Sequence, residues 1–149
     1  MELILWRHAE AEDTTPDSDR ALTVKGHKQA EKMAAWLQQH LPANTHILVS
    51  PAKRAQQTAK ALGLDFSTLD TLAPGASAQA ILDTTDWPSG NAVLVVGHQP
   101  TLGLVAARIM TGKTHYWCIK KSAVWWLSNR VRGEEEQCIL RAVVSPDLK

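Results

Sequence analysis

The chain has 149 residues, of which 44% are hydrophobic, and this suits one compact domain spanning residues 1–149. Sixteen basic residues stand against fifteen acidic ones, so the net charge of +1 gives no overall attraction to nucleic acid or to an anionic membrane. The sequence begins without the basic leader of a secretory signal, and no segment approaches the roughly 20 apolar residues that span a bilayer. Cys118 and Cys138 form no CxxC pair, which favours free thiols in a reducing cytoplasm over a metal site or a disulfide.

The hydrophobic pattern of the first half predicts alternating strands and helices. Residues 3–6 are a continuous apolar run, typical of a strand covered on both faces. Apolar residues at helical spacing predict an amphipathic helix over residues 25–41, and residues 47–49 then predict a second buried strand. The pair Ser50-Pro51 has the character of an N-cap and a first-turn proline, so we expect the next helix to begin there and to end near residue 62.

The second half continues the alternation. We expect a weaker strand over residues 64–72, a short helix over 78–83, a buried strand over 92–96, a helix opened by Pro100, and two antiparallel strands over 123–127 and 138–144 joined by a turn at 132–135. Together these elements predict an α/β fold. Its architecture would be a three-layer sandwich, with a mainly parallel sheet, helices on both faces and a C-terminal antiparallel hairpin.

Cationic and imidazole side chains follow three of the predicted strands. Arg7 and His8 follow the first strand, and His98 follows the strand over residues 92–96. Arg54 lies early in the helix after the second strand, and it shares one helical face with Gln57 and Thr58. The carboxyl ends of parallel strands meet at one edge of a sheet, so we expect these groups to converge there. No run of carboxylates accompanies them, and the combination suits a phosphoryl group.

Four segments carrying these residues resemble the histidine phosphatase superfamily, and especially its small SixA-like phosphohistidine phosphatases. The segments are residues 3–12 (LILWRHAEAE), 19–26 (DRALTVKG), 50–59 (SPAKRAQQTA) and 95–100 (VVGHQP). The resemblance implies roles for five residues of this chain. His8 would be the nucleophile, Arg7 and Arg54 would bind phosphate, His98 would be the second pocket histidine, and Arg20 would match an arginine that small members add before their first long helix.

These roles are consistent with the chemistry of the side chains. Histidine attacks phosphorus as neutral imidazole, and its ordinary pKa of about 6.5 leaves it mostly neutral in the cytoplasm. Guanidinium groups stabilise the charge on the equatorial oxygens of a transferring phosphoryl group, so we expect neither a metal nor a cofactor. Ala9 stands where the wider family commonly has glycine, so the backbone at this position has less conformational freedom.

Several residues keep a second interpretation. Arg20 either binds phosphate or pairs with Asp17 or Asp19. Glu10 either contacts the substrate and takes part in proton transfer or is a solvated loop carboxylate, and the same holds for Glu12.

The segment after the third predicted strand separates the possible substrate classes. Members of the wider superfamily that act on phosphoesters usually carry an acidic proton donor there, and residues 72–75 contain none. The connections are also short, so no large lid covers the site. We therefore expect a bulky substrate with a good leaving group, such as the phosphohistidine of a phosphotransfer domain.

Two other functions stay open. A small-molecule phosphomonoesterase of the same mechanism would need a proton donor, which Glu10 or Glu12 would provide. A non-enzymatic regulatory domain would bind phosphate or a metal through His8 and His98, although metal sites usually have a third ligand.

Overall fold

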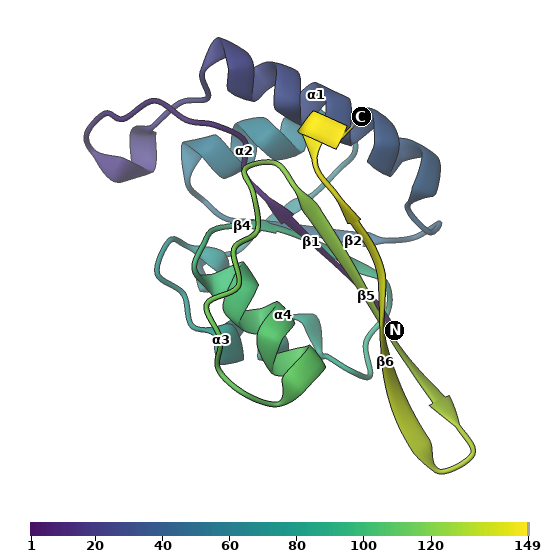
Figure 1. Cartoon of the computed structure of the whole chain (residues 1–149). Coiled ribbons are helices and arrows are strands. Elements are labelled where there is room, and N and C mark those ends of the chain that lie inside the picture. The colour runs from purple at the N-terminus through teal and green to yellow at the C-terminus, as the bar shows by residue number, and fades with distance from the viewer. Residues whose placement is uncertain (149) are drawn as a thin grey trace.

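The computed structural model describes residues 1–148, which form one six-stranded sheet with helices on both faces (Figure 1). The strand order is β3-β2-β4-β1-β5-β6, in which the first four strands run parallel, β5 is antiparallel to β1, and β6 is antiparallel to β5. The strands are β1 (Glu2–Arg7), β2 (His46–Val49), β3 (Ser67–Thr68), β4 (Val93–Gly97), β5 (Val124–Arg132) and β6 (Glu135–Val144). The predicted α/β sandwich with a C-terminal antiparallel hairpin is confirmed.

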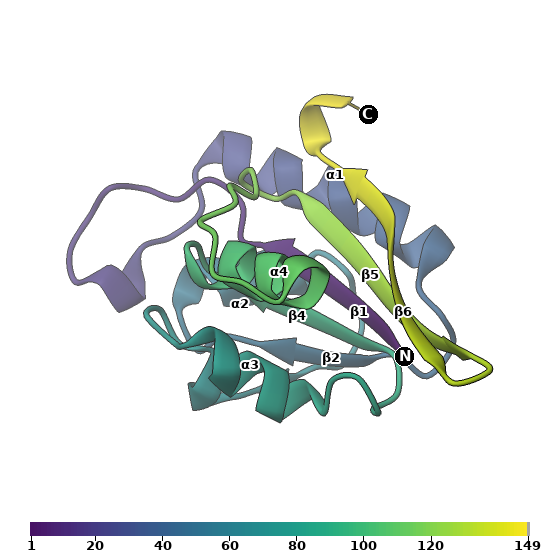
Figure 2. The ribbon, with the colours of Figure 1, turned by 60° about the horizontal axis from the view of Figure 1, so that its bottom comes forward.

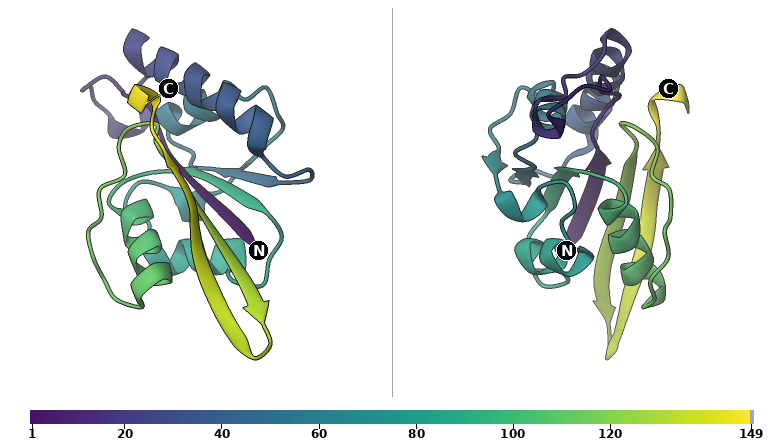
Figure 3. Two further views of the ribbon diagram at one scale, coloured as in Figure 1. Left: turned by 45° about the vertical axis from the view of Figure 1, so that its right-hand side comes forward. Right: turned by 90° about the vertical axis from the view of Figure 1, so that its left-hand side faces the viewer.

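The helices form two outer layers. Figures 2 and 3 show α1 and α2 on one side of the sheet, with α3 and α4 on the other. The helices are α1 (Val24–His40), α2 (Lys53–Lys60), α3 (Ala78–Thr85) and α4 (Thr101–Thr111), and short 3-10 turns are η1 (Asp17–Asp19), η2 (Asp70–Leu72) and η3 (Pro146–Leu148). In the described residues, no helix combines the length and the apolar character needed to cross a membrane.

The central strand β1 is buried on both faces, as its apolar run predicts. Leu3 and Leu5 pack in the cluster that includes α3 and α4, whereas Ile4 and Trp6 pack in the cluster that includes α1 and α2. All four side chains are fully buried. This two-sided burial holds β1 in place, and it fixes the position at which the chain leaves the sheet.

Three predicted boundaries were wrong. The second helix begins at Lys53 with Ala52 as its N-cap, because the hydroxyl of Ser50 bonds to the Ala52 N–H instead of capping a helix. The third strand contains only the exposed residues Ser67–Thr68 and gives way to η2. The hairpin strands extend further than their apolar cores because cross-strand pairs continue along them, as in the 3.2 Å bond between Arg130 Nε and Gln137 Oε1.

Backbone hydrogen bonds join the points at which three parallel strands end. The His8 N–H donates to the Gly97 carbonyl at 3.0 Å, and the Ser50 N–H donates to the Val96 carbonyl at 3.1 Å. The first residues beyond β1, β2 and β4 are thereby brought side by side at one edge of the sheet.

Candidate active site

A pair of buried histidines lies at this edge of the sheet. The ring centroids of His8 and His98 are 5.1 Å apart, with the ring planes tilted by 53°. Only 8% of His8 and 4% of His98 is exposed. The ends of two neighbouring strands, β1 and β4, therefore present two imidazoles to the same small region.

The tautomer of His8 follows from its one ring hydrogen bond. Nδ1 of His8 lies 2.8 Å from the carbonyl oxygen of Ala9. A carbonyl can only accept, so Nδ1 carries the proton and Nε2 of the neutral ring carries a lone pair. Thr58 of α2 holds this loop because its Oγ1 accepts the Ala9 N–H at 3.0 Å and donates to the Arg54 carbonyl at 2.8 Å.

His98 is held by a serine from the neighbouring strand end. Its Nε2 lies 2.7 Å from Oγ of Ser50, and that hydroxyl also accepts the Ala52 N–H at 3.2 Å. When the Ser50 hydroxyl donates to Nε2, the ring proton of His98 is on Nδ1. Nδ1 is buried and has no hydrogen-bond partner among the described residues, so it is a free donor in this arrangement.

Two arginines are anchored by backbone carbonyls. Arg7 donates from Nη1 to the Ile119 carbonyl at 2.8 Å, and Arg54, which is 4% exposed, donates from Nη1 to the Asp17 carbonyl at 2.8 Å. The Nε atoms of both side chains are buried without a partner in the part of the chain that the structure describes. Such fixed guanidinium groups with spare donors are suited to binding an oxyanion.

One carboxylate, that of Asp17, lies among these cations. Asp17 of η1 places Oδ2 3.1 Å from Nη2 of Arg54 and Oδ1 3.4 Å from Nη1 of Arg20. Arg20 also donates from Nε to the Glu12 carbonyl at 2.7 Å. Of the two interpretations of Arg20, the structure contains the ion pair with Asp17, and this pair connects Arg20 to Arg54.

The surroundings keep both histidines neutral. Burial lowers the pKa of His8 to about 4; the Ala9 carbonyl opposes this shift, and the neighbouring guanidinium groups reinforce it. Burial likewise lowers the pKa of His98 to about 3, helped by His8 and Arg54. Burial acts to raise the pKa of Asp17, but hydrogen bonds and charge interactions with Arg54 and Arg20 hold this pKa below its usual value. The site thus combines neutral imidazoles with cationic guanidinium groups.

The two glutamates after His8 have different surroundings. Glu10 accepts a hydrogen bond from the Thr23 hydroxyl at 2.8 Å, and its other carboxylate oxygen lies 3.8 Å from Nζ of Lys121. The Glu12 side chain is exposed, and its backbone pairs with Ala21. The contacts of Glu10 attach the loop to the start of α1, and a role for Glu10 in binding substrate stays a prediction.

Sequence reasoning missed two supporting residues. Asp17 was considered only as a partner for Arg20, and Ser50 was interpreted as a helix cap. A signal for Ser50 was present. Ser50 directly follows β2 and His98 directly follows β4, and these two strands are neighbours in the sheet. No comparable signal existed for Asp17, whose place depends on the path of the loop between β1 and α1.

A parallel α/β sheet presents neutral histidines and anchored arginines at the carboxyl edge of its strands, and these are side chains suited to binding a phosphoryl group. In residues 1–148 there is no group of three or more histidine, cysteine, aspartate or glutamate residues placed to hold a metal ion. Residues 3–73 match the histidine phosphatase superfamily (branch 1), a range that includes His8 and Arg54 and excludes His98. The chain belongs to this superfamily and is a SixA-like member of it.

Similar proteins cover most of the chain. It is 33% identical over 126 residues to the phosphohistidine phosphatase SixA homolog of Haemophilus influenzae, covering 73% of this chain and 77% of the relative. It is 30% identical over 132 residues to phosphohistidine phosphatase SixA of Escherichia coli, covering 76% of this chain and 77% of the relative. The solved structure of the protein histidine phosphatase SixA complexed with tungstate superposes with a TM-score of 0.79 and 27% identity over 100% of both chains.

Proposed function

We propose that this chain is a phosphohistidine phosphatase that acts through a phosphoryl intermediate on His8. The observation that carries the proposal is the neutral His8 ring, whose Nδ1 proton is directed to the Ala9 carbonyl and whose Nε2 lone pair is available beside anchored arginines. Membership of the superfamily, together with relatives named phosphohistidine phosphatase SixA, supports the same assignment.

The first step transfers the phosphoryl group to His8. The Nε2 lone pair attacks phosphorus in line with the scissile P–N bond, a new P–N bond forms, and the imidazole of the substrate leaves with its electron pair. The His8 ring then carries a positive charge shared with its Nδ1–H. The Ala9 carbonyl, which already accepts this proton at 2.8 Å, stabilises the cation. In the second step water attacks phosphorus, and His8 regains its lone pair as inorganic phosphate is released.

Arginine side chains stabilise the charge during both steps. Arg7 and Arg54 have spare donors for the equatorial oxygens, and the Nδ1–H of His98 supplies a neutral donor. Arg20 reaches the same anion once Asp17 releases it. The substrate dianion also favours a proton on His98, because an adjacent negative charge raises the pKa of an imidazole.

The leaving group favours phosphohistidine over an alkyl phosphate. Protonated phosphohistidine expels imidazole, whose conjugate acid has a pKa of about 6.5, whereas an alkyl ester expels an alkoxide whose conjugate acid resembles water, at about 15.7. An ester therefore requires a placed proton donor. The carboxyl beside Arg54 is Asp17, whose lowered pKa keeps it ionised at neutral pH and so without a proton to donate, and Glu10 is engaged by Thr23 and Lys121. The lack of a placed proton donor supports a phosphohistidine-bearing protein, such as a phosphotransfer domain, as the substrate. We place this reaction in the cytoplasm.

The first test traps the intermediate. During turnover of a phosphohistidine peptide, an alkaline denaturing quench should leave an acid-labile phosphoryl group on His8, located by mass spectrometry. His8→Ala should reduce turnover by at least a thousandfold without changing the circular dichroism spectrum. His27→Ala, at an exposed histidine on α1, is the matched control. Full activity in His8→Ala, or a phosphoryl group trapped on another residue, would contradict the proposal.

The second test compares substrates. Phosphohistidine should be cleaved fastest, phenyl phosphate more slowly because its leaving group has a pKa near 10, and alkyl phosphates slowest. Glu10→Gln and Glu12→Gln should change the phosphohistidine rate by less than about threefold, since no acid is required for that leaving group. Equal rates on alkyl phosphates, or a glutamine variant as inactive as His8→Ala, would favour the small-molecule phosphomonoesterase.

A further inference from the structure

A basic cleft opens beside the proposed active site. It has a volume of about 560 Å³ and lies between the N-terminal half of α1, residues 118–121 before β5, and residues 146–147 after β6. Figure 1 shows the C-terminal turn η3 beside α1, and Nζ of Lys32 donates to the Pro146 carbonyl at 3.2 Å across this junction. The cleft is lined by six cationic side chains and one carboxylate: Arg7, Lys25, Lys28, Lys32, Lys120 and Lys121, with Asp147.

Positive charge is concentrated in this cleft, because the net charge of the whole chain is only +1. Two of the lysines have acidic partners: Lys120 pairs with Asp147 at 3.0 Å and Lys121 lies 3.8 Å from Glu10. Lys25 and Lys28 are exposed and form no ion pair with any described residue. Their charge is therefore available to a partner.

The position of these two lysines is unfavourable for α1 itself. Lys25 is in the first turn of the helix, which contains no acidic residue, and Lys28 follows one turn later. The N-terminal end of a helix carries partial positive charge, so cations there destabilise the helix. Natural proteins break such local rules at functional sites.

The shape of the cationic surface indicates an extended ligand. Lys25, Lys28 and Lys32 follow one face of α1, and at 1.5 Å per residue they span about 10 Å along the helix. A single phosphate is held by donors that converge on one point, as Arg7 and Arg54 do in the active site. A row of exposed lysines instead matches several carboxylates distributed over a protein surface.

The cleft is continuous with the catalytic residues. Arg7 belongs to both, because its guanidinium lines the cleft and its backbone neighbour is His8. Gln29 also lines the cleft, and its Oε1 accepts the N–H of Glu10 at 3.0 Å in the loop that follows His8. A partner that places phosphohistidine at His8 therefore lies next to the cleft.

We propose that this cleft is a docking site for acidic residues that flank the phosphohistidine on the substrate protein. The proposal rests on the proposed function and adds its specificity determinant: Lys25 and Lys28 select phosphohistidine proteins with a carboxylate-rich surface next to the modified histidine. Electrostatic docking of this kind raises the association rate, and it weakens as salt screens the charges.

Two synthetic peptides test the proposal. Each carries one phosphohistidine, flanked by glutamates in the first peptide and by glutamines in the second. At low ionic strength the wild-type enzyme should hydrolyse the glutamate peptide with a kcat/KM about tenfold higher, and this preference should fall to about twofold or less at 0.5 M salt. The double variant Lys25→Glu/Lys28→Glu should lose this preference for the glutamate peptide.

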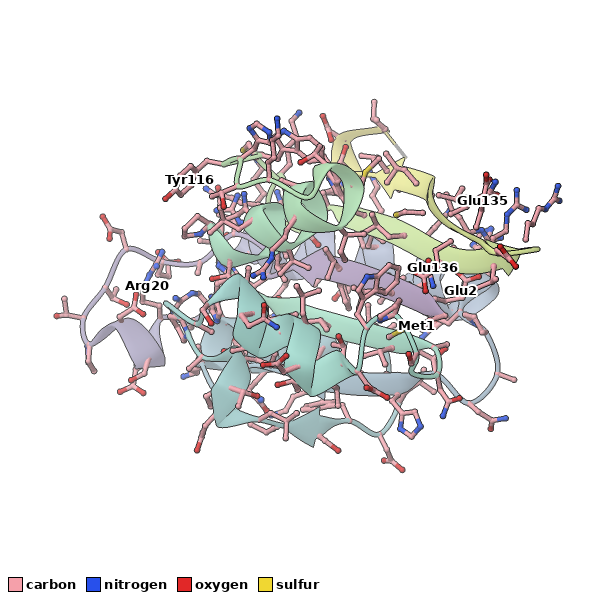
Figure 4. All side chains as sticks on the ribbon, turned by 90° about the horizontal axis from the view of Figure 1, so that it is seen from below. Met1, Glu2, Arg20, Tyr116, Glu135 and Glu136 are labelled. Carbon is pink, nitrogen blue, oxygen red and sulfur yellow. The ribbon has the colours of Figure 1, made fainter. Side chains whose placement is uncertain are left out.

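A matched charge reversal serves as the control. Arg130→Glu/Arg132→Glu changes the same number of charges on the hairpin, beyond the end of β1 opposite to His8. Figure 4 shows Glu135, which pairs with Arg132, at the end of the molecule opposite to Arg20. This variant should keep the preference for the glutamate peptide, because the two arginines lie outside the cleft.

The possible failures are distinguishable. Equal wild-type rates on the two peptides would overturn the docking proposal and leave the proposed function intact, whereas hydrolysis of neither peptide would overturn the proposed function. Loss of the preference in the hairpin variant would attribute it to overall charge and would also overturn the proposal. Tight binding of inorganic tripolyphosphate that depends on Lys25 and Lys28, without a peptide preference, would reassign the cleft to small polyanions.

Discussion

One backbone carbonyl determines which nitrogen of His8 can react. The Ala9 carbonyl accepts the Nδ1 proton, so the lone pair is on Nε2, and burial among guanidinium groups keeps the ring neutral far below physiological pH. In the proposed phosphoryl intermediate the same contact becomes stronger, because a cationic N–H is a better donor. Ala9, whose side chain departs from the glycine common in the wider family, thus fixes the His8 ring through its backbone carbonyl.

Asp17 is the acidic group that a substrate would encounter at Arg54. Its Oδ2 lies 3.1 Å from Nη2 of Arg54, which is a position that a phosphoryl oxygen would use. The Asp17 carbonyl bonds to Nη1 of the same guanidinium, so Arg54 keeps one anchor when the carboxylate moves away. The carboxylate therefore competes with the substrate for a cation that stays in position.

We predict that Asp17→Asn binds oxyanions more tightly. Removing the competing negative charge should lower the dissociation constant for tungstate by about three- to tenfold, measured by titration calorimetry. Asp19→Asn, at an exposed aspartate in the same η1 turn, should leave the constant unchanged. A weaker affinity in Asp17→Asn would mean that the carboxylate holds Arg54 in place for the anion.

At the scale of elements, the start of α1 is attached to the loop that carries His8. The Thr23 N–H donates to the Glu10 carbonyl at 3.0 Å, and the Thr23 hydroxyl caps the helix by accepting the Gly26 N–H at 2.9 Å. A Cβ atom added at Gly26 would lie 2.0 Å from the Glu10 carbonyl oxygen. The close approach of these two segments therefore requires glycine.

Gly26→Ala should destabilise the protein although alanine is the better helix former. The helix propensity gain of about 1 kcal/mol is smaller than the cost of separating two backbone segments, so we expect a net loss of about 2 kcal/mol in the free energy of unfolding by urea denaturation. Because the loop after His8 shifts, kcat/KM should also fall. Gln39→Ala, at an exposed position of α1, should change neither quantity appreciably. An unchanged unfolding free energy in Gly26→Ala would mean that the contact relaxes without cost.

The elements differ in how well the sequence predicts them. The periodicity of α1 and the apolar runs of β1 and β4 reflect burial that each segment imposes by itself, and their boundaries agree with the structure within about two residues. β3 is an exposed edge strand of two residues, so it has no hydrophobic pattern to detect. The start of α2 was placed too early because the same serine that could cap a helix instead holds His98.

The residues of the site also divide into those that a local sequence pattern predicts and those that depend on tertiary packing. His8 and His98 directly follow β1 and β4, and Arg54 is in the first turn of the helix after β2, so the rule for parallel sheets was sufficient to predict their common edge. The positions of Asp17 and of the lysine-lined cleft depend on how the loop after β1 and the C-terminal turn pack on the helices. Such packing brings together residues that are distant in the sequence, and a local sequence pattern does not predict it.

At the scale of the whole molecule, burying the site affects stability. His8 and His98 have pKa values lowered to about 4 and about 3, whereas each would return to about 6.5 in the unfolded chain. Between these values the unfolded state binds more protons than the folded state, so acidification favours unfolding. The stability associated with the neutral rings is fully present above pH 6.5 and is lost as the pH falls toward 4.

We therefore predict a free energy of unfolding that decreases from pH 7 to pH 5, with each buried histidine contributing about 2 kcal/mol to the decrease. Urea denaturation of the wild type and of His98→Gln at pH 7, 6 and 5 measures this contribution, because the difference between the two proteins cancels the titration of carboxylates that they share. His98→Gln should lose about 2 kcal/mol less than the wild type over this interval. His27→Gln removes an exposed histidine and should follow the wild type. Parallel pH profiles for the wild type and His98→Gln would mean that the folded protein protonates His98 as readily as the unfolded chain does, and the neutral histidine pair on which the phosphoryl-transfer mechanism depends would have to be abandoned.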